Sequence, residues 1–155
     1  MTKFFMTISV DQIKQLREET KAGVMDVRQA LQESNGDIKK AKEWLTQHGL
    51  SKAAKKAGRE TGDGVVEAYI HAGGRIGAMV KLSCETDFVA KTDDFKKLAR
   101  EIAMQVASMD PQSIDELLAQ AYIRDNSLTI EALIKDAIAK IGENIKVVEM
   151  KRMAI

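Results

Sequence analysis

Cysteine, proline and histidine are nearly absent from this sequence, which has one, one and two of them among 155 residues. Because Cys84 is alone, it cannot form an internal disulfide, and this favours a reducing compartment. Neither His48 nor His71 has cysteine, histidine or carboxylate residues near it at metal-ligand spacing. The sequence therefore predicts no metal site, no cofactor and no catalytic constellation, and we expect a protein that is not an enzyme.

The chain also lacks an excess of charge of either sign. Its 24 lysines and arginines against 23 aspartates and glutamates leave a net charge of +1, which supplies no general field for attracting nucleic acid or an anionic membrane. Residues 1–9 contain no apolar run long enough for a signal peptide or a membrane span. We expect a cytoplasmic protein that contacts neither a membrane nor, directly, nucleic acid.

A change of hydrophobic period marks the centre of the chain. Residues 76–84 alternate between apolar and other side chains, which predicts a strand with Cys84 on its buried face, and residues 93–109 carry apolar side chains at helical spacing. The segment between them is a strand-to-helix corner that contains Asp87 and Phe88. Spacing alone favours a cap at Thr86 or Asp87 with Phe88 folded back into the core, although an exposed aromatic ring would also suit contact with another protein.

The first fifty residues predict a three-helix module. Ser9 and Gln12 have capping-box spacing at the first helix, a second helix runs from about residue 24 or 25 to 33, and Gly49 is expected to close the third. The pattern resembles the ubiquitin-associated domain fold, in which the loop after the first helix, here Gly23-Val24-Met25, contacts ubiquitin. Because a fold does not determine its partner, we favour a docking module that does not bind ubiquitin.

We expect three parts: a module resembling the ubiquitin-associated domain at 1–51, a basic linker at 52–63 and a core or dimerisation domain at 64–155. In the core, strands at 65–71 and 76–84 form a hairpin, a helix capped by Thr129 ends at Gly142, and a third strand of unsettled register lies within 144–153. The predicted fold class is α+β, with about three antiparallel strands packed against helices. So small a sheet has exposed edges, which suggests self-association.

Several motifs in order resemble the elongation factor Ts family over nearly the whole chain. The matching segments are 13–26, 30–31, 35–38, 53–57, 86–91 and 139–145. In that family, Asp and Phe of a Thr-Asp-Phe-Val motif intrude beside the magnesium and phosphates of the GTPase elongation factor Tu. The resemblance implies a guanine-nucleotide exchange factor without catalytic chemistry of its own, whose partner is elongation factor Tu.

The resemblance also implies the site residues. Thr86, Asp87, Phe88 and Val89 would dislodge magnesium from the partner, with Phe88 an exposed wedge, and Lys91 would lie at the rim of the contact. Gly23, Val24 and Met25 would lie where the helical module docks. Longer family members have additional core segments, so we expect two copies of this short chain to pair as a homodimer.

One alternative comes from another class of protein. The N-terminal module together with Lys52, Lys55, Lys56 and Arg59 would suit an adaptor that binds a ubiquitin-like protein or nucleic acid. No aromatic residues lie between these charges, as binding of a single strand would favour, so a solvated helix face is the simpler interpretation.

Overall fold

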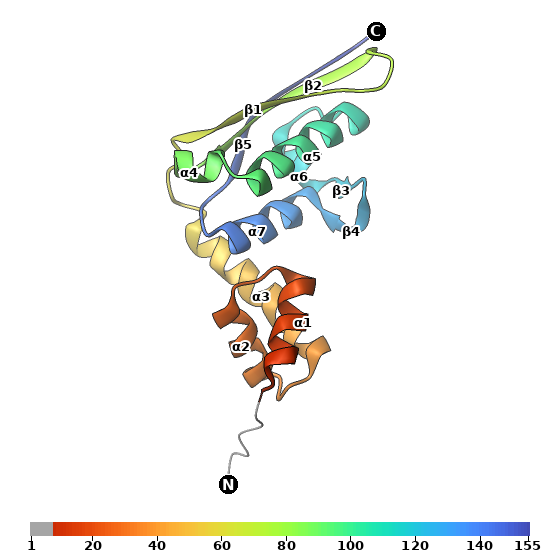
Figure 1. Cartoon of the computed structure of the whole chain (residues 1–155). Coiled ribbons are helices and arrows are strands. Elements are labelled where there is room, and N and C mark those ends of the chain that lie inside the picture. Colours follow the sequence, from red (N-terminus) through yellow and green to blue (C-terminus); the bar gives the residue numbers. More distant parts are fainter. Residues whose placement is uncertain (1–7) are drawn as a thin grey trace. The chain divides into compact units, whose positions relative to one another are not determined.

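The computed structural model describes residues 8–155, and the chain divides into two compact units, Met1–Lys52 and Ala53–Ile155 (Figure 1). Residues 1–7 lie outside the described residues. They make up most of the segment in which the sequence predicts no signal peptide or membrane span. Among the described helices, none is long and apolar enough to cross a bilayer.

The N-terminal unit contains three helices, α1 (Val10–Thr20), α2 (Val24–Glu33) and the first part of α3 (Ile38–Lys56). Ser9 and Gln12 form both hydrogen bonds of the predicted capping box, each at 3.1 Å. Five buried apolar side chains make the core of this unit: Leu16, Val27, Ala30, Leu31 and Ala41. The predicted three-helix module is therefore confirmed.

The expected end of the third helix at Gly49 is wrong, because α3 continues through this residue to Lys56. A glycine inside a helix costs only about 1 kcal/mol relative to alanine. The residues that follow it, Leu-Ser-Lys-Ala-Ala-Lys-Lys, are mostly good helix formers, and Ala53 is buried in the core of the second unit. The basic segment is thus helical as far as Lys56 and continuous with the third helix.

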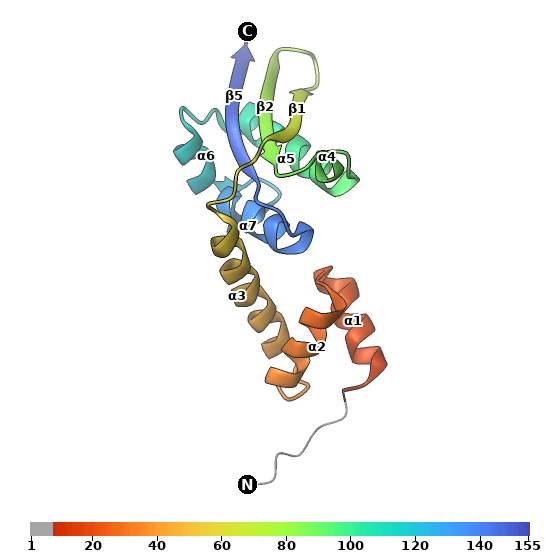
Figure 2. The ribbon, with the colours of Figure 1, turned by 90° about the vertical axis from the view of Figure 1, so that its left-hand side faces the viewer.

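The second unit is built on a three-stranded antiparallel sheet in the order β1 (Asp63–Ile70), β2 (Ile76–Cys84) and β5 (Lys146–Ala154), and Figure 2 shows the three strands side by side. This confirms the α+β class. The pairing of β2 with β5 shifts between Lys81 and Leu82, so that Val148 is an extra residue in β5. Such a bulge interrupts the period of two, which is why alternation did not settle the register of this strand.

Helix α5 (Asp93–Met109) lies between the sheet and α7 (Ile130–Ile141), as Figure 1 shows. Its buried residues include Phe95, Ile102 and the polar Gln105. The Gln105 side chain donates to the Ala121 carbonyl at 3.0 Å and accepts from the Ile123 amide at 3.0 Å. Gln105 therefore ties α5 to the segment around the small sheet formed by β3 (Ala121–Tyr122) and β4 (Asp125–Thr129), which follows α6 (Ile114–Ala119).

The two faces of the main sheet differ in character. Val80 and Leu82 belong to the core that includes α5, and Val65 packs against it. On the opposite face, alternation places Val66, Ile70, Met79 and Met153, of which 60%, 65%, 48% and 67% is exposed. Lys81, Glu149 and Lys151 lie on the same side. This solvent-facing side is called the outer sheet face below.

Candidate functional site at the strand-to-helix corner

The corner between β2 and α5 contains a one-turn helix, α4 (Asp87–Ala90), which the periodicity did not predict. Thr86 is its N-cap, and its hydroxyl accepts from the Val89 amide at 3.5 Å. Ala90 is buried and Val89 packs against the core, whereas Phe88 is 80% exposed. Of the two predicted caps, Thr86 and Asp87, the structure has Thr86. The interpretation in which Phe88 folds back into the core is wrong.

The direction of Phe88 follows from helix geometry. Successive side chains of an α-helix point about 100° apart, since there are 3.6 residues per turn. With Val89 and Ala90 turned towards the core, the preceding ring lies on the outer side of α4. The sequence of buried and exposed residues in this single turn thus places a large aromatic side chain in solvent.

Asp87 and Lys91 form an ion pair across α4. The Lys91 Nζ donates to Asp87 Oδ2 at 2.6 Å, with both side chains largely exposed. This hydrogen bond and the charge of Lys91 hold the pKa of the Asp87 carboxyl below its usual value, and the same partner raises the pKa of Lys91. Two of the candidate site residues are therefore charged at neutral pH and paired with each other.

Cys84 is fully buried, as its position on the apolar side of the strand predicted. Its Sγ donates to the Thr86 carbonyl at 3.2 Å. Burial, followed by the negative charges of Glu143 and Asp63, raises the pKa of the thiol to about 11. Since the thiolate is the nucleophilic form, Cys84 acts at neutral pH as a packing group.

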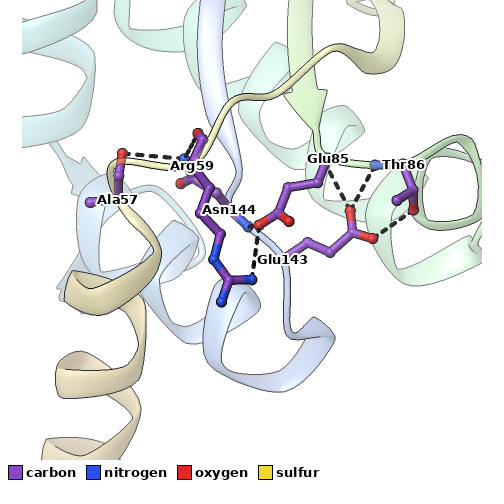
Figure 3. Close-up of polar contacts among 6 residues, drawn as sticks. All are labelled: Ala57, Arg59, Glu85, Thr86, Glu143 and Asn144. Atoms are coloured by element: carbon purple, nitrogen blue, oxygen red, sulfur yellow. Dashed lines mark hydrogen bonds and ion pairs between the residues drawn. The ribbon is translucent and has the colours of Figure 1, made fainter.

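A reciprocal pair of carboxylates fixes the start of the corner (Figure 3). Glu143 Oε2 accepts from the backbone amides of Glu85 and Thr86, both at 3.0 Å, and Glu143 Oε1 accepts from the Thr86 hydroxyl at 2.6 Å. In return, Glu85 Oε1 accepts from the Asn144 amide at 2.7 Å. We call these four residues, Glu85, Thr86, Glu143 and Asn144, the clasp.

The clasp extends to a third segment of chain through Asn144, which is 2% exposed. Its side-chain amide donates to the Ala57 carbonyl at 3.3 Å and to the Arg59 carbonyl at 2.8 Å, while the Arg59 guanidinium lies 3.6 Å from Glu85 (Figure 3). Hydrogen bonds that involve a charged group are roughly twice as strong as neutral ones. The corner is therefore joined to the segment after α3 and to the start of the chain leading into β5.

Comparison with known proteins covers this region. The family model described as elongation factor TS matches residues 85–155. The elongation factor Ts of Rippkaea orientalis is 42% identical, and the alignment covers 96% of this chain and 78% of the relative. The chain belongs to the elongation factor Ts family. The elongation factor Ts of Desulfosudis oleivorans is 39% identical, over 96% of this chain and 98% of the relative. The elongation factor Ts of Fervidobacterium nodosum is 41% identical, over 97% of this chain and 99% of the relative.

This member of the elongation factor Ts family is short beside those relatives. Each alignment runs over 194 or 195 positions, more than the 155 residues of the chain, so the relatives contain residues with no counterpart here. The family model begins at Glu85. Both the corner and the clasp consequently lie in the part that the family model matches.

The remaining candidate site residues of this elongation factor Ts family member, Gly23, Val24 and Met25, lie in the other compact unit. Gly23 is the N-cap of α2, and the side chains of Val24 and Met25 that follow are 45% and 72% exposed. Of the basic residues considered for an adaptor, Lys52 donates to Asp26 at 2.7 Å and Arg59 pairs with Glu85. Two of the four cations are thus engaged within the chain, which weakens the adaptor interpretation.

Sequence reasoning missed the roles of Glu143 and Asn144. The available signal was their position directly after Gly142, which caps α7 at φ 92° in the left-handed region and so turns the chain sharply. Their partners are Glu85 and Thr86, 57 to 59 residues away. Within residues 8–155, no group of three or more histidine, cysteine or acidic side chains is placed to hold a metal ion.

Proposed function

We propose that this protein is a guanine-nucleotide exchange factor that binds elongation factor Tu carrying GDP, displaces magnesium and promotes GDP release so that GTP can bind. Family membership supports the partner. The observation that carries the mechanism is the exposed Phe88 ring on a corner whose neighbouring residues are fixed. In this role the protein has no catalytic chemistry and no cofactor of its own, and it works in the cytoplasm.

The corner acts as a wedge in this proposal. Magnesium in a GTPase bridges the nucleotide phosphates and protein ligands. Phe88 and Asp87 enter beside those ligands and disturb their geometry, with Thr86 and Val89 holding the turn beneath them and Lys91 at the rim. Magnesium demands near-ideal octahedral coordination, so a small displacement of its ligands is enough to weaken GDP binding.

Exchange then follows from linkage. A factor that binds the nucleotide-free state more tightly than the GDP-bound state lowers the affinity for GDP, and nucleotide lowers the affinity for the factor by the same ratio. Incoming GTP therefore expels the factor. The helical module contributes affinity through the segment Gly23-Val24-Met25, in which the exposed side chains of Val24 and Met25 offer an apolar contact.

The test is release of a fluorescent GDP from purified elongation factor Tu, with wild-type protein and with Phe88→Ala. We expect strong acceleration by the wild type and a loss of about tenfold or more in the variant, because large aromatic anchors dominate such contacts. Met109→Ala, which shortens an exposed apolar side chain at the end of α5, is the matched control and should behave as wild type. No acceleration by wild-type protein would refute the function, and acceleration indifferent to Phe88 would refute the wedge.

We also propose that two copies of the chain pair through the outer sheet face. The exposed apolar side chains of Val66, Ile70, Met79 and Met153 support this pairing, as does the absence of residues that the longer relatives contain. Sedimentation equilibrium should give twice the chain mass, and Met79→Glu should shift it towards the monomer because a charge would be buried in the pair. A monomeric mass for the wild type at working concentration would refute the pairing.

A further inference from the structure

The clasp offers an inference that rests on the proposed exchange function and extends it to residues outside the corner. We propose that Glu143 is a positioning residue for exchange, which holds the strand-to-helix corner in the conformation that presents Phe88. Its carboxylate contacts the corner backbone at two consecutive amides and the hydroxyl of the N-cap residue Thr86. It thereby fixes the two residues that precede α4.

The geometry of these contacts indicates that Glu143 acts on the corner through the position of its carboxylate oxygens more than through its charge. Glu143 is bidentate: one oxygen serves the Glu85 and Thr86 amides at 3.0 Å and the other serves the Thr86 hydroxyl at 2.6 Å. Three acceptor interactions from one side chain specify the orientation of the turn, and they require the full length of a glutamate. The Glu85 carboxylate in turn accepts from the backbone amide of Asn144 at 2.7 Å. The corner and the segment after α7 therefore each contribute a carboxylate that binds the backbone of the other (Figure 3).

The consequence for Phe88 follows from its distance along the chain. Only Asp87 separates it from Thr86, and α4 has a single turn, which is too short to be stable without outside support. If Glu143 releases the corner, the start of α4 frays and the ring samples many directions. Binding in the required direction would then incur the ordering entropy that a fixed corner avoids, and the maximal rate of exchange would fall.

Two variants separate reach from charge. Glu143→Gln keeps the length and an oxygen for the two amides, while its NH₂ can donate to the Thr86 hydroxyl; Glu143→Asp keeps the charge but withdraws it by one methylene. We expect Glu143→Ala and Glu143→Asp to lower the maximal GDP-release rate at saturating factor by about tenfold, with a smaller change in the half-saturating concentration. Glu143→Gln should recover most of that loss.

The control is Glu131→Ala, which removes a carboxylate that pairs with Lys135 on the surface of α7, the helix before Glu143. It should leave exchange unchanged. Far-UV circular dichroism at the assay temperature shows whether each variant is folded. If Glu143→Ala is unfolded, the comparison of Glu143→Gln with Glu143→Asp decides. Equal rates for folded variants, or a faster Asp than Gln variant, would overturn the positioning role.

A second measurement uses the free protein without elongation factor Tu. Hydrogen exchange at the Glu85 and Thr86 amides should be about tenfold or more faster in Glu143→Asp than in the wild type, with the β2 amides unchanged. Unchanged protection at both amides would overturn the proposal even if exchange activity fell. If the wild type fails to accelerate GDP release while the amides respond as expected, the exchange function has failed and the clasp has not.

Discussion

Two phenylalanines seven residues apart should respond in opposite ways to truncation. Phe88 is 80% exposed on α4, whereas Phe95 is fully buried in α5. Full burial of a phenylalanine side chain is worth about 1.5–3 kcal/mol, so the fifth of Phe88 that is removed from water contributes about 0.3–0.6 kcal/mol. Phe88→Ala should therefore lower the free energy of unfolding by less than about 1 kcal/mol, and Phe95→Ala by about 3–5 kcal/mol.

The assay is urea unfolding followed through the backbone amide signals of β2. Fluorescence is less suitable, because Trp44 is the one tryptophan and lies in the other compact unit. Truncation of a core phenylalanine lowers the free energy of unfolding by about 3–5 kcal/mol. A loss of more than about 1.5 kcal/mol in Phe88→Ala, half the lower end of that range, would show that the ring is packed in the core. That result would refute the exposed wedge independently of any exchange assay.

Three further predictions concern single groups. With a pKa of about 11, roughly one Cys84 thiol in a thousand is ionised at pH 8. Iodoacetamide should therefore label Cys84 slowly in the native protein and readily in urea. Fast labelling of the native protein would contradict the burial of Cys84. Gly64→Ala should lower the free energy of unfolding by about 1–3 kcal/mol, because φ of Gly64 is +155° and the added Cβ would lie 2.2 Å from the backbone oxygen of Leu82. Gly62 has open space around it, so Gly62→Ala should change the free energy of unfolding little. Lys91→Met should raise the pKa of Asp87 towards its usual value, which a carboxyl NMR titration would measure. Because the pKa of Asp87 is lower in the folded than in the unfolded state, the stabilisation from its ion pair is present above the unfolded pKa and is lost as the pH falls through the folded pKa. An unchanged titration midpoint for Asp87 in the variant would contradict the ion pair.

The sequence predicted best those elements that have a regular local pattern. Residues 76–84 and 93–109 match β2 and α5 because each has one clean apolar face against the core. The end of α3 was misplaced because a glycine inside a helix costs only about 1 kcal/mol. The helix continues past Gly49 to Ala53, which is buried in the core of the second unit. β5 was found without its register, since the extra Val148 interrupts the alternation.

The candidate site was predictable in part for a related reason. A cap at Thr86 or Asp87 could be predicted because the bond from the Val89 amide to the Thr86 hydroxyl is local. The direction of Phe88 could not be read from spacing, because it depends on which neighbours reach the core. The Glu143 contact lies beyond any local rule, since it joins residues 57 and 58 positions apart and its geometry depends on the turn at Gly142.

Exposure alone does not mark Phe88 as a contact residue, because Val10 and Ile155 are also exposed, at 66% and 91%, and isolated apolar side chains are normal on protein surfaces. What distinguishes Phe88 is that the chain is fixed on both sides of it. Before it, the clasp holds the backbone of Thr86; after it, Val89 and Ala90 are held by the core. A ring presented from such a support loses little conformational entropy on binding. The same apolar area on a free chain end would lose more, and this difference favours the corner as the part of the protein that meets its partner.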